Sequence, residues 1–242
     1  MHKNISWSGY EWITRERWGN IHADKLFCHY NPKCVYKDDY EYLHLLTKKD
    51  PKKFKIKQGD NQTVIESPIG VGLVSSKEKF GYGYYEIEAK LPLGENLWPA
   101  FWMWSWDGWP PEIDVFEGYT DSRKGYLKFN RFNPFGFYNV QSNFHYKDIK
   151  TSKNANAKAK THYFGLKNPT TNFIKYGLKY LEDEITIFYN GRAVRSLPKN
   201  LLQYFKGHKM NVIINNSVSQ GVDETKENYS DFVVKYFKYE SL

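Results

Sequence analysis

The sequence predicts an all-β protein, an antiparallel sandwich or barrel, and three observations support this prediction. Tyr, Phe and Trp make up 18% of the chain while Met is sparse, a balance that favours pleated strands over helices. Many short segments alternate between apolar and polar residues, with turn residues between them. Only one short helix is expected, over residues 199–205. No segment is typical of an interdomain linker, so we expect a single domain spanning residues 1–242.

The clearest predicted strand covers residues 82–91, where alternation places four apolar side chains on one face: Tyr85, Ile87, Ala89 and Leu91. A hairpin is predicted around Asn190-Gly191, because this dipeptide permits positive φ at both turn positions between the segments 185–189 and 192–194. Residues 150–161 are poor in apolar side chains and are expected to form a surface loop. The remaining strands are expected at residues 40–46, 62–66, 71–76, 98–104, 138–146, 173–181, 209–215 and 231–240.

The formal net charge of +8 indicates either a solvated basic surface or an anionic ligand. The basic residues look dispersed, with no polybasic arm or basic helix, and no nucleic-acid-binding signature is present. No apolar stretch is long enough to span a bilayer. We therefore expect neither a nucleic-acid nor a membrane partner, and a monomer.

Cys28 and Cys34 flank the turn-like segment His-Tyr-Asn-Pro-Lys, a spacing that permits either a small-loop disulfide or two free thiols. Neither these cysteines nor the seven histidines show the spacing of metal ligands, so a catalytic metal is not expected. No cofactor is expected either.

A run of carboxylates carries the strongest functional signal. Glu112 and Asp114 share one face of the predicted strand Pro-Glu-Ile-Asp-Val-Phe-Glu, and Glu117 would turn away from it in regular geometry. A β-bulge of one residue returns Glu117 to the same face, and bulges are common beside active sites. Three carboxylates on one face repel each other when all are ionised. We therefore expect at least one of them to have a raised pKa, which would supply an acid.

Tryptophans flank this run on its N-terminal side: Trp98, Trp102, Trp104, Trp106 and Trp109. An acidic strand face in isolation is typical of a solvated surface. Beside so many indoles, it is typical of a groove in which sugar rings stack on aromatic side chains. Paired carboxylates are the groups that cleave glycosidic bonds. The sequence therefore predicts a carbohydrate-cleaving cleft.

At these residues the chain resembles glycoside hydrolase family 16, the group of laminarinases, lichenases, agarases and carrageenases. The run from Glu112 to Glu117 is similar to the family's bulged Glu-x-Asp-x-x-Glu signature. Further similar blocks occur in the same order from about residue 60 to the end of the chain: 82–92, 97–102, 143–146, 173–180, 185–191, 210–216 and 232–239.

The resemblance implies a β-jelly-roll sandwich of two curved antiparallel sheets with a substrate cleft on the concave face. It implies that Glu112 is the nucleophile, that Glu117 is the acid/base, and that Asp114 orients and tunes the nucleophile. Sugar-binding roles would fall to Trp98 and Trp102 in the cleft, with Trp109 beside them, and to His145 next to the acid/base. A structural Ca²⁺ is common in the family, but no oxygen-rich ligand run here indicates one.

The implied reaction is retaining hydrolysis of internal bonds in a β-1,3- or β-1,3-1,4-glucan. Arg123 and Arg131, in a basic stretch after the signature, are either ordinary surface residues or part of a loop that binds sulfate or carboxylate groups. The second case keeps a sulfated galactan such as carrageenan, porphyran or agar open as substrate. A transglycosylase and a non-catalytic lectin on the same fold are the remaining alternatives.

The resemblance further implies an extracellular or cell-surface protein. Met1-His2-Lys3-Asn4 does not open a signal peptide, so we expect a leader that has been trimmed or release by another route, as for a phage-borne enzyme.

Overall fold

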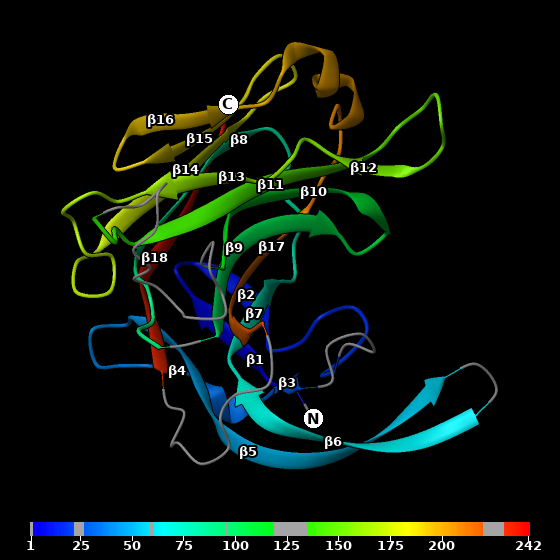
Figure 1. Ribbon diagram of the computed structural model, residues 1–242, viewed down its shortest axis with the longest axis vertical. Helices are drawn as coiled ribbons and strands as arrows, with labels where there is room; N and C mark the ends of the chain where they lie inside the picture. The colour runs from blue at the N-terminus through cyan, green and yellow to red at the C-terminus, as the bar shows by residue number, and fades with distance from the viewer. Residues whose placement is uncertain (1, 22–26, 59–60, 95, 119–134, 220–229) are drawn as a thin grey trace.

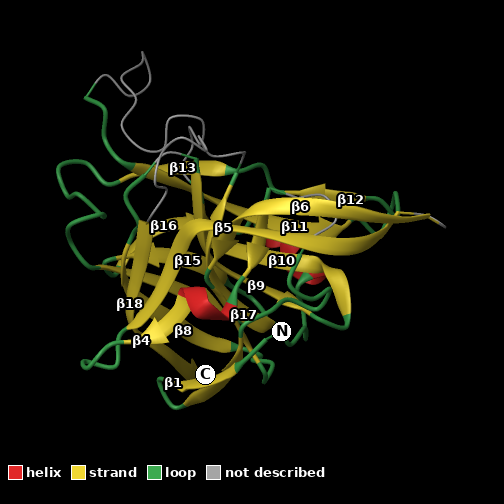
Figure 2. Cartoon of the chain, turned by 90° about the horizontal axis from the view of Figure 1, so that it is seen from below, coloured by secondary structure: helices red, strands yellow, loops and turns green. Residues whose placement is uncertain are grey.

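The computed structural model describes residues 2–21, 27–58, 61–94, 96–118, 135–219 and 230–242. Within these ranges the regular structure is β-strand apart from two 3₁₀ helices, η1 (Pro32–Cys34) and η2 (Lys199–Tyr204). The second is the short helix expected from the sequence. The strands form two large sheets that face each other, as Figures 1 and 2 show. The predicted all-β sandwich is confirmed.

The first sheet carries the tryptophan-rich strand and the carboxylate strand side by side. Among the described residues it has nine strands, in the order β1 (Asn4–Trp7), β2 (Tyr10–Ile13), β7 (Leu73–Ser76), β17 (Asn211–Val218), β9 (Leu97–Ser105), β10 (Gly108–Glu117), β11 (Asn139–Lys147) and β12 (Asn154–Asn156), with β13 (Lys160–Tyr163) also paired to β11.

The second sheet packs against the first, and the core lies between them. Over the same described ranges it also has nine strands, in the order β16 (Arg192–Ser196), β15 (Ile185–Tyr189), β14 (Ile174–Tyr180), β8 (Gly83–Lys90), β18 (Ser230–Ser241), β5 (Leu43–Gln58), β6 (Asn61–Val71) and β3 (Cys28–Tyr30), with β4 (Val35–Lys37) paired to β5. All pairings are antiparallel except that of β3 with β6, which is parallel. This pair departs from the expected purely antiparallel sheets.

The core between the sheets is rich in aromatic side chains. Phe116 of β10 lies 4.5 Å from Tyr176 of β14 and 6.1 Å from Phe232 of β18, measured between ring centroids. All three are fully buried. Strand β8 alternates buried and half-buried residues along its whole length, as predicted, because its apolar face contacts this core. The residue next to Phe116 is Glu117, so the carboxylate strand is anchored directly in the core.

The local predictions hold in most places. Asn190 and Gly191 both have positive φ, 49° and 76°, as the predicted hairpin turn requires. Cys28 and Cys34 are both buried and keep their thiols rather than forming a disulfide, which decides between the two alternatives left open. The expected loop at residues 150–161 is partly wrong, since β12 lies inside it and β13 begins there, both paired to β11. Backbone pairing to an existing strand edge outweighs their polar composition.

No helix in the described part of the chain is long and apolar enough to cross a bilayer.

Candidate active site

A bulge in β10 brings three carboxylates to one face of the first sheet. On one side of β10, Asp114 pairs with Asn143 and Glu117 pairs with Gln141, and the register shifts between these pairs. The strand on the other side shifts at the same place. The extra residue turns Val115 and Phe116 both into the core, which returns Glu117 to the face of Glu112 and Asp114. The predicted bulge is confirmed.

The second sheet holds the bulge in place. The hydroxyl of Tyr189 in β15 donates a hydrogen bond of 2.9 Å to the backbone carbonyl of Val115, and both residues are buried. A carbonyl displaced from the regular ladder is thereby satisfied inside the core, where an unpaired one would be costly. The position of the carboxylates therefore depends on packing between the two sheets.

The three carboxylates open into one cleft of about 790 Å³. This volume suits a ligand of several rings. The cleft is lined by Arg17, Trp18, Cys28, Tyr30, Trp98, Ala100, Trp102, Trp104, Trp109, Glu112, Asp114, Glu117, Asn215 and Ser217. The predicted trio and the three predicted tryptophans thus meet in a single site.

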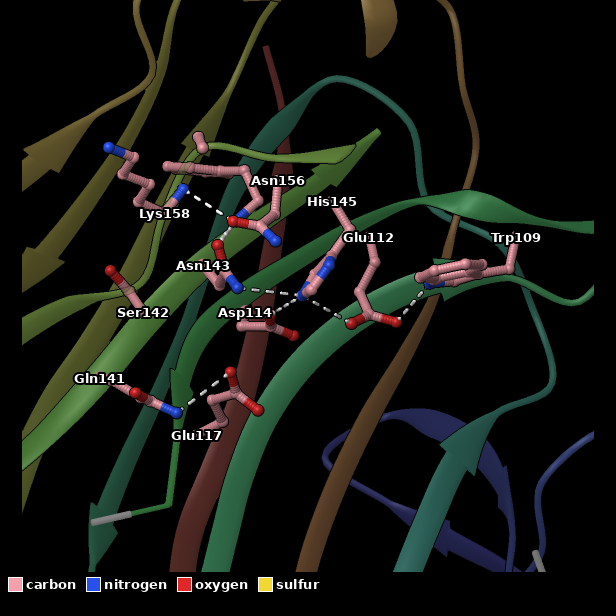
Figure 3. Close-up of polar contacts among 12 residues, drawn as sticks. Trp109, Glu112, Asp114, Glu117, Gln141, Ser142, Asn143, His145, Asn156 and Lys158 are labelled. Atoms are coloured by element: carbon pink, nitrogen blue, oxygen red, sulfur yellow. Dashed lines mark hydrogen bonds and ion pairs between the residues drawn. The ribbon is translucent and has the colours of Figure 1, made fainter. Parts of the chain in front are cut away.

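Glu112 lies at one end of the carboxylate row (Figure 3). The indole Nε1–H of Trp109 donates to its Oε2 at 2.9 Å, and Nε2 of His145 lies 3.5 Å from its Oε1. Burial raises the pKa of Glu112 to about 8, and the charges of Asp114 and Glu117 reinforce the shift, while His145 and the Trp109 hydrogen bond oppose it. The expected raised pKa is present, and it belongs to the residue that the resemblance makes the nucleophile.

Asp114 occupies the middle of the row and is 2% exposed. Its Oδ2 lies 3.3 Å from Nε2 of His145, the same nitrogen that faces Glu112. The side-chain Nδ2 of Asn143 lies 3.1 Å from the same nitrogen and donates to it when Nε2 is unprotonated; a protonated Nε2 donates to the carboxylates instead. One histidine therefore bridges two carboxylates and can neutralise part of their mutual repulsion when protonated.

Glu117 lies at the other end and has different neighbours. Nε1–H of Trp98 donates to its Oε2 at 3.3 Å, and the amide of Gln141 donates to its Oε1 at 3.5 Å. We expected His145 beside this glutamate. The antiparallel register instead places His145 opposite Glu112, and Gln141 takes the predicted position.

The tryptophans of β9 form an aromatic wall beside the carboxylates. Their alternation along the strand points Trp98, Trp102 and Trp104 into the cleft. The rings of Trp102 and Trp104 are nearly parallel, with an interplanar angle of 8° and centroids 6.5 Å apart. Asn215 of β17 accepts a 2.8 Å hydrogen bond from Nε1 of Trp102 and so fixes that ring. The C–H faces of sugar rings can stack on such a wall.

Several site residues were missed from the sequence. Gln141 could have been found, because it lies on the same strand face as Asn143 and His145 at period two. The run of three polar residues that contains Asn215 and Ser217, within an otherwise apolar and mostly buried β17, is a weaker signal. Arg17, Trp18 and Tyr30 reach the cleft from distant segments, and nothing in their local pattern indicates it. The predicted Arg123 and Arg131 lie outside the described residues.

Glu112, Asp114 and His145 also place one potential ligand atom each within 4.8 Å of one another. Two carboxylates and an imidazole are donors that a divalent cation accepts. Glu112 and Asp114 also belong to the carboxylate row, in which Glu117 is the third member. The donor set thus fits a cation as well as it fits catalysis, although the sequence indicated no metal.

A β-sandwich with carboxylates crossing an aromatic cleft is the arrangement of a carbohydrate-active protein. The sequence profile of Glycosyl hydrolases family 16 matches residues 24–237. The chain belongs to glycoside hydrolase family 16.

Individual relatives are more distant. An endo-1,3-1,4-beta-glycanase, EglC of Rhizobium meliloti (strain 1021), is 27% identical over 126 residues, which is 51% of this chain and 23% of that protein. The chain therefore matches about a quarter of the length of this relative.

Solved structures share the fold. The catalytic domain of an endo-1,3-beta-glucanase (laminarinase) from Thermotoga petrophila RKU-1 superposes with a TM-score of 0.67 at 21% identity, covering 93% of this chain and 85% of that one. The kappa-carrageenase from Pseudoalteromonas carrageenovora gives 0.68 at 18% identity, covering 97% of each chain.

Proposed function

We propose that the protein is a retaining endo-β-glycanase that hydrolyses internal bonds of a β-1,3- or β-1,3-1,4-glucan. The observation that carries this proposal is the bulged strand, which presents Glu112 and Glu117 on one face of an aromatic cleft. Trp109 contacts the first glutamate and Trp98 the second, so aromatic rings lie at both ends of the carboxylate row. A polymer can therefore be held on both sides of the bond that is cut. The name of the Rhizobium relative supports the choice of glucan.

In the proposed mechanism Glu112 attacks the anomeric carbon while Glu117 protonates the departing glycosidic oxygen. This gives a covalent glycosyl–enzyme. Glu117, now a carboxylate, then takes a proton from water, and the resulting nucleophile releases Glu112 with overall retention. Asp114 holds His145 beside Glu112, and a protonated imidazole there favours the charged, nucleophilic form of Glu112.

The raised pKa of Glu112 bears on this assignment. In the free cleft Glu112 holds a proton up to about pH 8, whereas attack requires its carboxylate. The role therefore requires that the proton leaves before the first chemical step. A histidine whose Nε2 lies 3.5 Å from Oε1 of Glu112 is placed to stabilise the ionised form.

Azide rescue tests the two roles separately. With an activated β-glucoside, Glu112→Ala plus azide is expected to yield an α-glycosyl azide, because azide replaces the missing nucleophile on the opposite face. Glu117→Ala plus azide is expected to yield the β-anomer, because azide then attacks the glycosyl–enzyme. Exchanged anomers would reverse the assignment, and absence of rescue in both variants would contradict double displacement at this site.

A sulfated galactan is the second candidate substrate, and Arg17 favours it. This arginine is exposed and lines the cleft beside Trp18, and a guanidinium binds sulfate in a bidentate manner. A reducing-end assay on laminarin, mixed-linkage glucan, agarose, porphyran and κ-carrageenan distinguishes the candidates. Activity on a sulfated polymer that Arg17→Gln abolishes would favour the second. Added acceptor sugars expose transglycosylation, and binding without turnover on every polymer would indicate a lectin.

We further propose that the enzyme acts without a cofactor, as a monomer, on polysaccharide outside the cell. The pair Glu112 and Asp114 would then serve catalysis rather than metal binding. Dialysis against EDTA is expected to leave turnover unchanged. Loss of turnover that Ca²⁺ or Zn²⁺ restores would contradict this proposal.

A further inference from the structure

The hairpin of β5 and β6 extends well beyond the sandwich. The body contacts only its base, since β18 pairs with β5 at residues 43–47 and β3 pairs with β6 at residues 69–71. Beyond those positions the two strands pair only with each other, among the described residues, from Lys52 opposite Ser67 outward. Both ribbon views show this segment standing out from the body (Figures 1 and 2). We call residues 48–58 and 61–67 the lysine arm.

The arm is unusually basic. Six lysines occur within ten residues: Lys48, Lys49, Lys52, Lys53, Lys55 and Lys57. Asp50, the acidic residue of the same strand, is engaged at the base, where it accepts a hydrogen bond from the side chain of Asn31 and lies 3.2 Å from Nε2 of His29. The expectation that the basic residues are dispersed, with no polybasic arm, is therefore wrong. The hairpin pairing that creates the arm spans more residues than the short strands predicted at 40–46 and 62–66.

The two faces of the arm differ. Strand alternation places Phe54 and Ile56 on one face, and both are half-buried; the ring of Phe54 lies 5.0 Å from that of His29 in β3. Lys53 and Lys55 point from the opposite face and are exposed. Glu66 of β6 is exposed opposite Lys53 on this face, but within the part of the chain that the structure describes neither lysine has a carboxylate within 4.0 Å. Their ammonium groups are thus available on a strand repeat of ~6.6 Å.

Lysines on a free strand edge also discourage edge-to-edge aggregation, which is the plain structural explanation for them. That explanation requires charge but no ligand. A row of like charges repels itself, however, and an anion that bridges the row relieves the repulsion. Solubility and ligand binding therefore give different expectations for a lysine-to-glutamine change.

We propose that the lysine arm is a second binding surface, separate from the cleft, for a linear polysaccharide that carries regularly spaced sulfate or carboxylate groups. Flexible point charges on one face suit repeated anions along an extended chain. The described basic face presents no aromatic ring on which nucleic-acid bases could stack, because Phe54 is on the other face. It presents only Val64 as an exposed large apolar side chain, too little for insertion into a bilayer.

The arm adjoins the cleft through β3. His29 contacts Phe54 and Asp50 of the arm, while its neighbours Cys28 and Tyr30 line the cleft. A polyanion held on the arm therefore keeps the cleft close to the matrix in which its substrate lies. This role holds whichever polymer the cleft cuts.

The test uses the full chain and two charge-matched variants. Lys53→Gln/Lys55→Gln alters the arm, and Lys150→Gln/Lys153→Gln removes the same charge from two exposed lysines between β11 and β12. The probes are dextran sulfate and neutral dextran, and calorimetry at low salt measures the affinity of each variant for them. We expect the arm variant to bind dextran sulfate about tenfold more weakly than wild type, with the difference shrinking at high salt. The control variant and laminarin hydrolysis should change little.

Three results would each overturn the proposal. Equal weakening in the two variants would show that only net charge matters. Equal binding of dextran and dextran sulfate would show that the anionic groups are not recognised. Tighter binding of the arm to a single-stranded oligonucleotide or to anionic vesicles than to dextran sulfate would assign it to another class of ligand.

Discussion

The indole Nε1–H of Trp104 lies 3.3 Å from Oε2 of Glu16, so a wholly buried carboxylate behind the cleft holds part of its aromatic wall. Ser75 donates to the other oxygen of Glu16 at 3.1 Å, and the backbone N–H of Arg17 approaches at 3.3 Å. Burial raises the pKa of Glu16 to about 8, although these hydrogen bonds act in the opposite direction. An ionisable group thus supports the wall without touching the substrate.

This burial predicts a pH-dependent stability. Between about pH 4.5 and 8 the folded protein keeps the Glu16 proton that the unfolded chain releases, so stability falls as pH rises through that window. Glu16→Gln mimics the neutral form and is expected to flatten the fall in Tm between these pH values. Each unit of pKa shift corresponds to ~1.4 kcal/mol. Thermal unfolding across this range measures the effect.

Glu66→Gln, at an exposed position, is the matched control for the loss of one carboxylate. Its slope of Tm against pH should equal that of the wild type. A Glu16→Gln slope equal to the control would show that Glu16 does not carry the proton.

A second prediction concerns the stability that the protein loses by placing three carboxylates in one row. Glu112→Gln removes a carboxyl group whose ionised form is disfavoured by burial and by two like charges. We expect turnover to fall on the order of a thousandfold or more, as for removal of a nucleophile, while Tm at about pH 8 rises. Glu117→Gln should lower turnover by about 10²–10⁴-fold. Wild-type turnover in either variant would contradict the roles proposed, and a lower Tm of Glu112→Gln would contradict the electrostatic cost.

His145 gives a third prediction, through the pH profile. Its charge lowers the pKa of Glu112, so its removal raises that pKa further. Because the attacking form is the Glu112 carboxylate, the acidic limb of kcat/KM should move to higher pH in His145→Gln. The loss should be larger at about pH 6 than at about pH 9. His208→Gln, an exposed position outside the cleft, is the control, and parallel profiles for the two variants would exclude the effect.

The sequence predicted the all-β fold and the shared face of Glu112, Asp114 and Glu117 because both depend on local pattern. Alternation in residues 82–91 and the spacing from Glu112 to Glu117 survive in the structure without change of face. The bulge was also predictable, because one extra residue is needed to bring Glu117 to the face of the other two carboxylates.

The features that the sequence did not predict depend on which distant segments of the chain come into contact. The neighbour of Glu117 is Gln141 rather than His145 because antiparallel register decides it, and a single-residue shift changes every pair. Glu16 is more than fifty residues from its partner Ser75, and its burial has no local signature. The lysine arm was overlooked because the projecting hairpin that gathers the six lysines exists only when β6 pairs with β5 along its whole length.

The last prediction tests the link between the bulge and the aromatic wall at Gly118. This residue has φ of +49°, and a Cβ added to it would lie 2.6 Å from the ring of Trp98. Gly191 also has positive φ, +76°, but a Cβ there meets nothing within 4 Å. Alanine at either position should therefore cost about 1–2 kcal/mol in backbone strain, or a few degrees in Tm.

Only Gly118→Ala should also displace Trp98, which donates to Glu117 and lines the cleft. We expect its kcat/KM on glucan to fall about tenfold or more, since small misplacements at a reacting centre are costly. Gly191→Ala should keep wild-type kcat/KM, although it carries the same kind of backbone strain. Equal kcat/KM in the two variants would show that Trp98 does not position the acid/base, and the aromatic wall would then serve binding alone.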